Sequence, residues 1–205
     1  MTNARKSRES AREKVERMRA EQAAAARRRT IMIVAATVVL LLAIAGGVSA
    51  VVLNSRTPAV SLAAVQTFTE SRNHVQGKVN YPQTPPAGGD HNPVWLNCGI
   101  YTSPVANENA VHDLEHGAVW ITYEPNLAKA DVDKLTKYAK GQTYLDLSPY
   151  PDLPAPVVVS AWGKQLKLTG ASDPRLEAFV KKYKQGSQTP EPGSPCTGGT
   201  GTPNG

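Results

Sequence analysis

The histidines carry the clearest chemical signal in this sequence. All four of them, at positions 74, 91, 112 and 116, fall within 43 residues of a 205-residue chain. His112 and His116 are spaced i,i+4, so both imidazoles leave the same face of a helix. Two neutral imidazoles at that spacing can chelate one divalent ion. The spacing therefore predicts a metal site centred on His112 and His116.

Other potential ligands lie on either side of this pair. His74 and His91 could reach the site from a loop, and Glu115 lies within the paired segment. Asp90 and Asp113 could serve as further ligands or orient the imidazoles through hydrogen bonds. A competing interpretation stays open, because the helix dipole favours a histidine at a helix C-terminus without any metal. In that interpretation the histidines are hydrogen-bonded structural residues.

The segment from His112 to His116 also reads H-x-x-E-H, a pattern of one class of zinc peptidases. In those enzymes two histidines bind zinc and the glutamate, here Glu115, activates water. A peptidase site lies inside a longer helix, whereas Gly117 is expected to end this helix directly after the motif. A metallohydrolase is therefore the least favoured of the hypotheses considered.

The chain contains two cysteines, Cys98 and Cys196. In an oxidising compartment two cysteines most simply form one disulfide. Such a bond would close a long loop and contribute about 4–5 kcal/mol in the chain-entropy model. Thiolate ligation of a metal or redox exchange is the alternative. The sequence has no C-x-x-C motif, which disfavours a thioredoxin-type oxidoreductase.

The positive charge is concentrated at the N-terminus. Residues 1–30 contain ten Lys or Arg and four Glu, which accounts for the whole net charge of +6. The remainder is neutral overall, so we expect no nucleic-acid partner. This segment is rich in Ala, Glu, Arg and Lys and lacks Pro and Gly, which predicts a basic cytoplasmic helix.

Residues 31–53 are an uncharged, almost entirely apolar run. As a helix, the run can cross a hydrocarbon core of about 30 Å. Three arginines at 27–29 precede it and only Arg56 follows closely, and an excess of Lys and Arg marks the cytoplasmic side. We therefore expect a single-pass anchor in the lipid bilayer of the cell membrane, with an extracytoplasmic C-terminal domain. The alternative is a signal peptide cleaved near residues 48–50, but this apolar run exceeds the usual length of about 7–15 residues.

The remainder of the chain predicts a linker at 54–66, an extracytoplasmic domain at 67–185 and a tail at 186–205. Residues 74–97 form a long Pro- and Gly-rich loop, and loops of this length are usually functional or disordered. The tail has 16 Gly, Pro, Ser or Thr in 20 positions, so we expect it to be disordered apart from Cys196. Periodicity and turn residues predict helices at 107–116, 128–140 and from 173 onward, and strands at 65–70, 118–123, 143–147, 157–162 and 165–169.

These elements predict a small α/β (α+β) domain in which helices cover a mixed sheet, preceded by a long N-terminal helix that includes one transmembrane span. From residue 107 the order is helix, strand, helix, short strand, hairpin and helix. This order is similar to that of thioredoxin-like folds. A likeness of fold alone does not indicate function.

Two longer segments support a resemblance to a known family. They are YPQTPPAGGDHNPVWLNCGIY at 81–101 and AVHDLEHGAVWITYEP at 110–125, with Asn73-His74-Val75 before them. These segments resemble the domain of unknown function 3105 family, which consists mostly of actinobacterial proteins with one N-terminal membrane span. The resemblance covers about residues 60–185 and implies that the histidines and Glu115 recur among members. It implies no activity.

Three hypotheses follow. The first is a membrane-anchored extracytoplasmic protein that binds a divalent metal without catalysing a reaction. Because no methionine follows residue 53, imidazole ligation of Cu(II) or Zn(II) is favoured over a Met-rich Cu(I) site. The second is an accessory, assembly or interaction module of cell-envelope or respiratory complexes, with structural histidines. The third is the H-x-x-E-H metallohydrolase.

Overall fold

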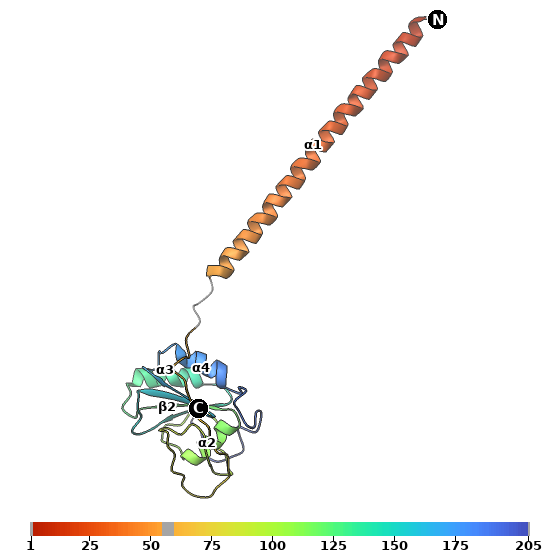
Figure 1. The fold of residues 1–205 in the computed structure, drawn as a ribbon. Coiled ribbons are helices and arrows are strands. Elements are labelled where there is room, and N and C mark those ends of the chain that lie inside the picture. Colours follow the sequence, from red (N-terminus) through yellow and green to blue (C-terminus); the bar gives the residue numbers. More distant parts are fainter. Residues whose placement is uncertain (1, 55–59, 205) are drawn as a thin grey trace. The chain divides into compact units, whose positions relative to one another are not determined.

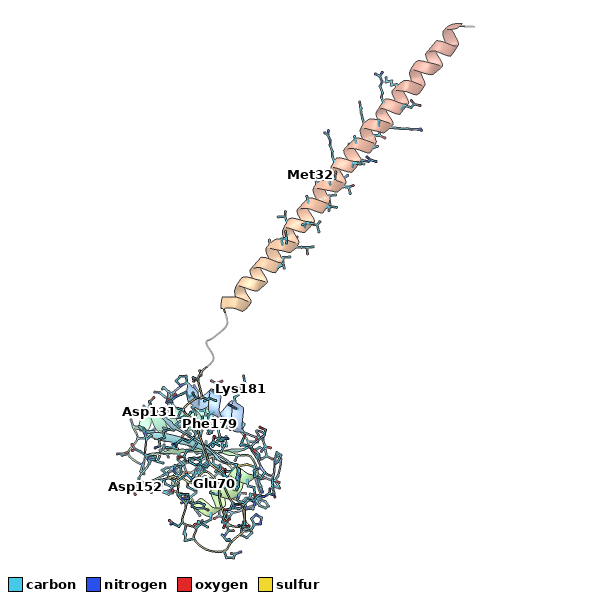
Figure 2. The ribbon with its side chains drawn as sticks, viewed as in Figure 1. Met32, Glu70, Asp131, Asp152, Phe179 and Lys181 are labelled. Carbon is cyan, nitrogen blue, oxygen red and sulfur yellow. A yellow bond between two sulfur atoms is a disulfide. The ribbon has the colours of Figure 1, made fainter. Side chains whose placement is uncertain are left out.

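The computed structural model describes residues 2–54 and 60–204, which form two units described separately below. The first unit contains one continuous helix, α1 (Thr2–Asn54) (Figure 1). Its stretch from Glu16 to Gly47 is long and apolar enough to cross a membrane. The large apolar side chains of this stretch are exposed, and Figure 2 shows Met32 pointing outward from the helix. The predicted long apolar N-terminal helix is therefore confirmed.

The second unit is built on a five-stranded mixed sheet. Strands β2 and β3 are parallel and every other neighbouring pair is antiparallel, in the order β1-β5-β4-β2-β3. This confirms the predicted mixed sheet and α+β fold. The strands are β1 (Gln66–Thr67), β2 (Val119–Tyr123), β3 (Leu145–Pro149), β4 (Val157–Ala161) and β5 (Lys164–Leu168).

Helices cover both faces of this sheet (Figure 1). Helices α3 (Lys129–Ala139) and α4 (Arg175–Tyr183) pack on one face, where Leu135 and Phe179 join a large apolar core. Helix α2 (Asn107–Glu115) packs on the other face through Leu114 and its apolar neighbours. Successive strand residues point to opposite faces, so Trp120 joins the α2 core while both of its neighbours in β2 join the α3–α4 core.

Helix α2 is short and almost completely buried, which fixes the direction of its side chains. Ala106 is its N-cap and makes no side-chain capping hydrogen bond. The side-chain amide of Asn107 donates a hydrogen bond to the Tyr150 hydroxyl. The helix ends at Glu115, one residue earlier than predicted, and His116 caps it. Gly117 has a φ of +99°, which allows the chain to turn directly into β2.

The C-terminal segment is ordered on the domain, so the prediction of a disordered tail was wrong. The Asn97 amide donates to the Thr200 carbonyl, and the Asn204 amide donates to the Ile100 carbonyl. Cys196 forms the expected disulfide with Cys98. Main-chain hydrogen bonds and one covalent bond hold this segment. Amino-acid composition alone predicts neither of them. Of the predicted linker, residues 55–59 lie outside the described residues.

The disulfide is expected to contribute strongly to stability, because it closes a loop with a sequence separation of 98 residues. Replacing Cys98 and Cys196 together by Ser should lower the free energy of unfolding by about 4 kcal/mol. That loss corresponds to a fall in Tm of roughly 10 °C or more. Thermal denaturation measures the loss, and hydrogen exchange should show the Asn97 amide losing protection. An unchanged Tm would show that the tail is held without the disulfide.

Candidate metal centre

The long loop and helix α2 bring the predicted ligands to one place. In the loop, the Val75 amide donates to the His91 carbonyl and the His91 amide to the Asn73 carbonyl, at 2.8 and 3.0 Å. The Asp90 carboxylate accepts two further hydrogen bonds from Asn73, one from the main chain and one from the side chain. We call these four hydrogen bonds the Asp90 clamp. They hold the rings of His74 and His91 4.9 Å apart, centre to centre.

The loop histidines meet the polar side of α2. His74, His91, His112 and Glu115 each offer one ligand atom, and these four atoms all lie within 4.8 Å of one another. His116 joins from the end of the helix, with its Nε2 2.9 Å from the Nε2 of His112. Only the side chain of His74 is substantially exposed, at 48%. All five predicted ligands therefore converge, although their binding of a metal stays a prediction.

Main-chain carbonyls fix the orientation of the three buried imidazoles. The Nδ1 atoms of His91, His112 and His116 lie 2.8, 2.7 and 2.6 Å from the carbonyl oxygens of Gly89, Asn92 and Pro195, respectively. A carbonyl oxygen can only accept, so we assign the proton to Nδ1 in each ring. Each Nε2 therefore presents its lone pair to the interior of the cluster, which is how a metal-binding histidine is oriented.

Two contacts inside the cluster bring acceptor atoms together. The first is between the Nε2 atoms of His112 and His116. The second joins His91 Nε2 to Glu115 Oε2 at 3.0 Å. With Nδ1 protonated, neither contact is a hydrogen bond unless an additional proton enters it. Each contact therefore requires a proton or a metal ion.

The protonation preferences of these groups differ. Burial, together with the neighbouring imidazoles, lowers the pKa of His112 to about 4, so this ring is neutral at pH 7. Burial also acts to lower the pKa of His91, but hydrogen bonds with Glu115 and the Gly89 carbonyl outweigh it and raise that pKa. Burial acts to raise the pKa of Glu115, but the imidazoles outweigh it and lower that pKa. Without metal, these two shifts favour a protonated His91 beside an ionised Glu115.

Two tryptophans enclose the cluster. Trp162 meets the His91 ring edge-on at 5.8 Å, and Trp95 lies 5.8 and 5.4 Å from the rings of His112 and His116. The Trp95 indole nitrogen donates to the Thr197 carbonyl in the C-terminal segment. These aromatic walls restrict water at the imidazoles and strengthen electrostatic interactions there.

Two predicted auxiliary residues do not join the cluster, and one unpredicted residue approaches it. Asp90 binds Asn73, as described above, and Asp113 faces Asp146 on the far side of α2. Glu191 brings its Oε2 to 3.9 Å from His116 Nε2. Sequence reasoning missed Glu191 because a disordered tail was expected. The only signals were the single cysteine and single carboxylate in that tail.

A buried carboxyl pair lies beside the disulfide. Asp146 accepts a hydrogen bond from the Gly99 amide, while both side-chain oxygens of Asp113 and the second oxygen of Asp146 have no partner among the residues described. Burial raises the pKa of Asp146 to about 7 and that of Asp113 well above its usual value. Cys98 lies close to both carboxyls, but its sulfur is bonded to Cys196. This cluster therefore offers no thiolate.

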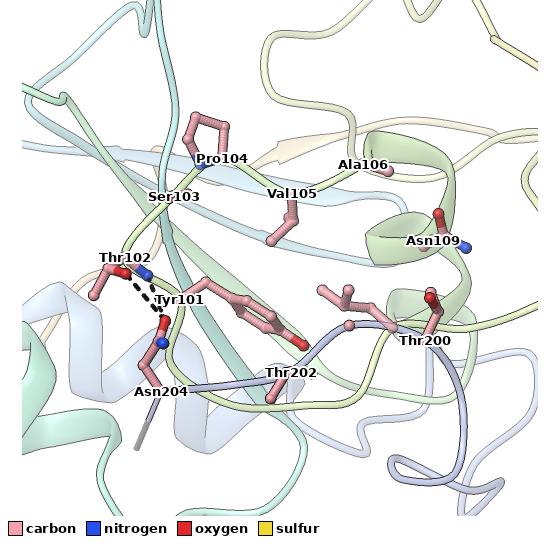
Figure 3. Close-up of a pocket in the computed structure, with 12 residues that line it drawn as sticks. Tyr101, Thr102, Ser103, Pro104, Val105, Ala106, Asn109, Thr200, Thr202 and Asn204 are labelled. Atoms are coloured by element: carbon pink, nitrogen blue, oxygen red, sulfur yellow. Dashed lines mark hydrogen bonds between the residues drawn. The ribbon is translucent and has the colours of Figure 1, made fainter.

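A groove of about 410 Å³ lies on another part of the domain, between the segment after Tyr101 and the C-terminal segment (Figure 3). The Asn204 side chain spans one end and accepts two hydrogen bonds from Thr102. None of the lining residues is charged, and none is histidine. They are Leu96, Tyr101, Thr102, Ser103, Pro104, Val105, Ala106, Asn109, Thr200, Gly201, Thr202 and Asn204.

The fold and the site together define a class of protein: an apolar helix of membrane-spanning length followed by an α+β domain with a buried histidine–glutamate cluster. Residues 74–198 match the family described as "Protein of unknown function (DUF3105)", and the chain belongs to this family. No curated protein and no solved structure matches the chain. The thioredoxin-like arrangement stays a prediction.

The buried carboxyl pair predicts a pH-dependent stability effect. A folded-state pKa of about 7 means that Asp146 contributes most stability below about pH 4 and loses it as the pH rises to 7. Asp146→Asn removes this ionisation and can donate to Asp113. The variant should therefore unfold at a higher temperature than wild type at pH 8, with a gain of about 1–4 kcal/mol. The gain should shrink towards pH 5.

Thermal denaturation across this pH range measures the effect, with the exposed Asp133→Asn as the control. Asp133 forms only a surface ion pair with Lys129, so its replacement should change Tm little at any pH. A loss of stability in Asp146→Asn at pH 8 would contradict the interpretation of this pair as a buried, destabilising charge.

Proposed function

We propose that this chain is a membrane-anchored protein whose extracytoplasmic domain binds a divalent transition-metal ion at the cluster, without catalysing a reaction. The observation that carries this proposal is the orientation of the three buried imidazoles, whose Nε2 lone pairs converge while carbonyls hold each Nδ1. The proposed ligands are His74, His91, His112, Glu115 and His116.

The donor set favours Cu(II) or Zn(II). Imidazole nitrogens with one carboxylate suit these ions, whereas Ca(II) and Mg(II) prefer all-oxygen sites. The disulfide removes both cysteines as thiolate ligands. The domain contains no methionine, so it lacks the thioether ligands typical of Cu(I) sites.

The burial pattern supports a site that holds its ion and is open to solvent beside His74. His91, His112, Glu115 and His116 are buried, and His74 alone is open to solvent. An ion therefore enters beside His74, whose loop is held by the Asp90 clamp. Glu115 pairs with His91 and lies 3.7 Å from His74, which supports a role as a ligand over a role as a free base. This placement disfavours the metallohydrolase.

We also propose that α1 anchors the domain outside the cell membrane, with its basic N-terminal end in the cytoplasm. The excess of Lys and Arg before residue 31 supports this orientation. A protease added to spheroplasts should remove an epitope tag placed after Gly205 and spare a tag placed before Met1. Lysed spheroplasts serve as the control, because both tags should then be lost. Protection of the C-terminal tag alone would show that the topology is the opposite of the one proposed.

The metal site is tested by titrating the full chain, purified in detergent, with Zn(II) and with Cu(II). Replacing His112 and His116 by Ala should weaken the binding of one ion by at least 100-fold, because it removes two of its ligands, and His74→Ala should weaken binding less. Isothermal titration calorimetry gives the affinities. Binding should also weaken as the pH falls below neutrality, because the metal must displace the proton that His91 holds at its raised pKa.

A matched control is available on α3, where Lys129 and Asp133 form an exposed i,i+4 pair. Replacing both by Ala should leave the affinity unchanged. If wild type binds neither Zn(II) nor Cu(II), or if the double-histidine variant binds as many ions as wild type with the same affinities, the proposal fails. The histidines would then be structural, as in an assembly or interaction module of envelope or respiratory complexes.

A further inference from the structure

The cluster is elongated and contains two similar groups of atoms. At one end, Glu115 Oε2 lies 3.0 Å from His91 Nε2 and 3.7 Å from His74 Nε2. At the other end, His116 Nε2 lies 2.9 Å from His112 Nε2 and 3.9 Å from Glu191 Oε2. Each group therefore combines two imidazole nitrogens with one carboxylate oxygen. We call them the loop triad, of His74, His91 and Glu115, and the tail triad, of His112, His116 and Glu191.

The distances within each triad are short enough for a shared ion. With metal–ligand bonds of about 2.0–2.2 Å, two ligands of one ion are at most about 4.4 Å apart. The two contacts that Glu115 makes in the loop triad and the two that His116 makes in the tail triad all fall below that limit. His116 and Glu191 fall outside the group of four residues whose ligand atoms all lie within 4.8 Å of one another. His112 does belong to that group, so an ion in the loop triad lies near His112 and leaves His116 and Glu191 without a cation.

The fixed tautomers give each triad its own need for positive charge. The His91–Glu115 contact lies in the loop triad and the His112–His116 contact lies in the tail triad. Both bring lone pairs together, because Nδ1 carries the proton in all three buried rings. One cation in the loop triad does not relieve the second contact. Each contact needs a proton or a metal ion of its own, so the geometry accommodates one cation in each triad.

We propose that the cluster binds two divalent transition-metal ions, one in each triad, and that Glu191 is a ligand of the second. This inference rests on the proposed function and extends it. Glu191 is half-exposed at 51%, so the tail triad opens to solvent, and Glu115 is buried. Each triad leaves coordination positions open for water or a small anion, as sets of two histidines and one carboxylate do.

The C-terminal segment positions the second site. The Pro195 carbonyl accepts from His116 Nδ1, and the Glu191 amide donates to the Glu115 carbonyl at 3.0 Å. The next residue after Pro195 is Cys196, which the disulfide attaches to Cys98. Both the carboxylate and the orientation of His116 therefore depend on a segment far from α2 in the sequence.

The experiment counts ions. The full chain in detergent is stripped of metal, equilibrated with Zn(II), and examined by native mass spectrometry and by metal analysis after gel filtration. Wild type should hold two Zn(II) per chain. Glu191→Gln should weaken one of them by at least tenfold and leave the other unchanged. Glu115→Gln should affect the opposite site. Exposed Glu177→Gln, on α4, is the matched control and should still hold two.

Each result separates this inference from the proposed function. If wild type binds no Zn(II), the proposed function itself fails. If wild type binds only one, the two-ion inference is overturned while the proposed function stands. If Glu191→Gln binds two with unchanged affinities, the assignment of Glu191 is wrong. Circular dichroism of each variant confirms that a lost ion does not reflect an unfolded domain.

Discussion

Three hydrogen bonds from imidazole Nδ1 atoms to main-chain carbonyls organise the polar half of this domain. The carbonyls belong to Gly89, Asn92 and Pro195, which lie in the long loop and in the C-terminal segment. His112 therefore ties the loop to α2 and His116 ties the C-terminal segment to the end of α2, whereas His91 bonds within the loop. These bonds add to apolar packing, since Leu96 and Tyr81 of the loop also pack in the α2 core.

The two faces of the sheet bury different kinds of side chain. The α3–α4 face is an apolar core whose burial supplies most of the stabilising free energy. The α2 face buries ionisable groups, including Asp113 and Asp146, and such burial costs free energy unless each group has a partner. The apolar face thus stabilises the domain, and the α2 face holds buried ionisable groups of the kind found at functional sites.

The sequence predicted regular structure better than it predicted irregular structure. Runs such as AVWITY and the turn at Gly117 located β2 and the end of α2, because periodicity and glycine chemistry act locally. The i,i+4 spacing likewise predicted that the imidazoles of His112 and His116 lie side by side. Glu191 and the three carbonyls were not predictable, because their positions depend on main-chain hydrogen bonds, which any residue type can make.

The position of Pro195 and Cys196 near the C-terminus has a consequence for biogenesis. A nascent chain already contains α2, the loop and all four histidines when residue 116 has been made. It still lacks the carbonyl that orients His116 and the cysteine that holds that carbonyl in place. The cluster is therefore completed only after residue 196 has been synthesised and the disulfide has formed. A truncated or unoxidised chain would carry every histidine and still lack the finished site.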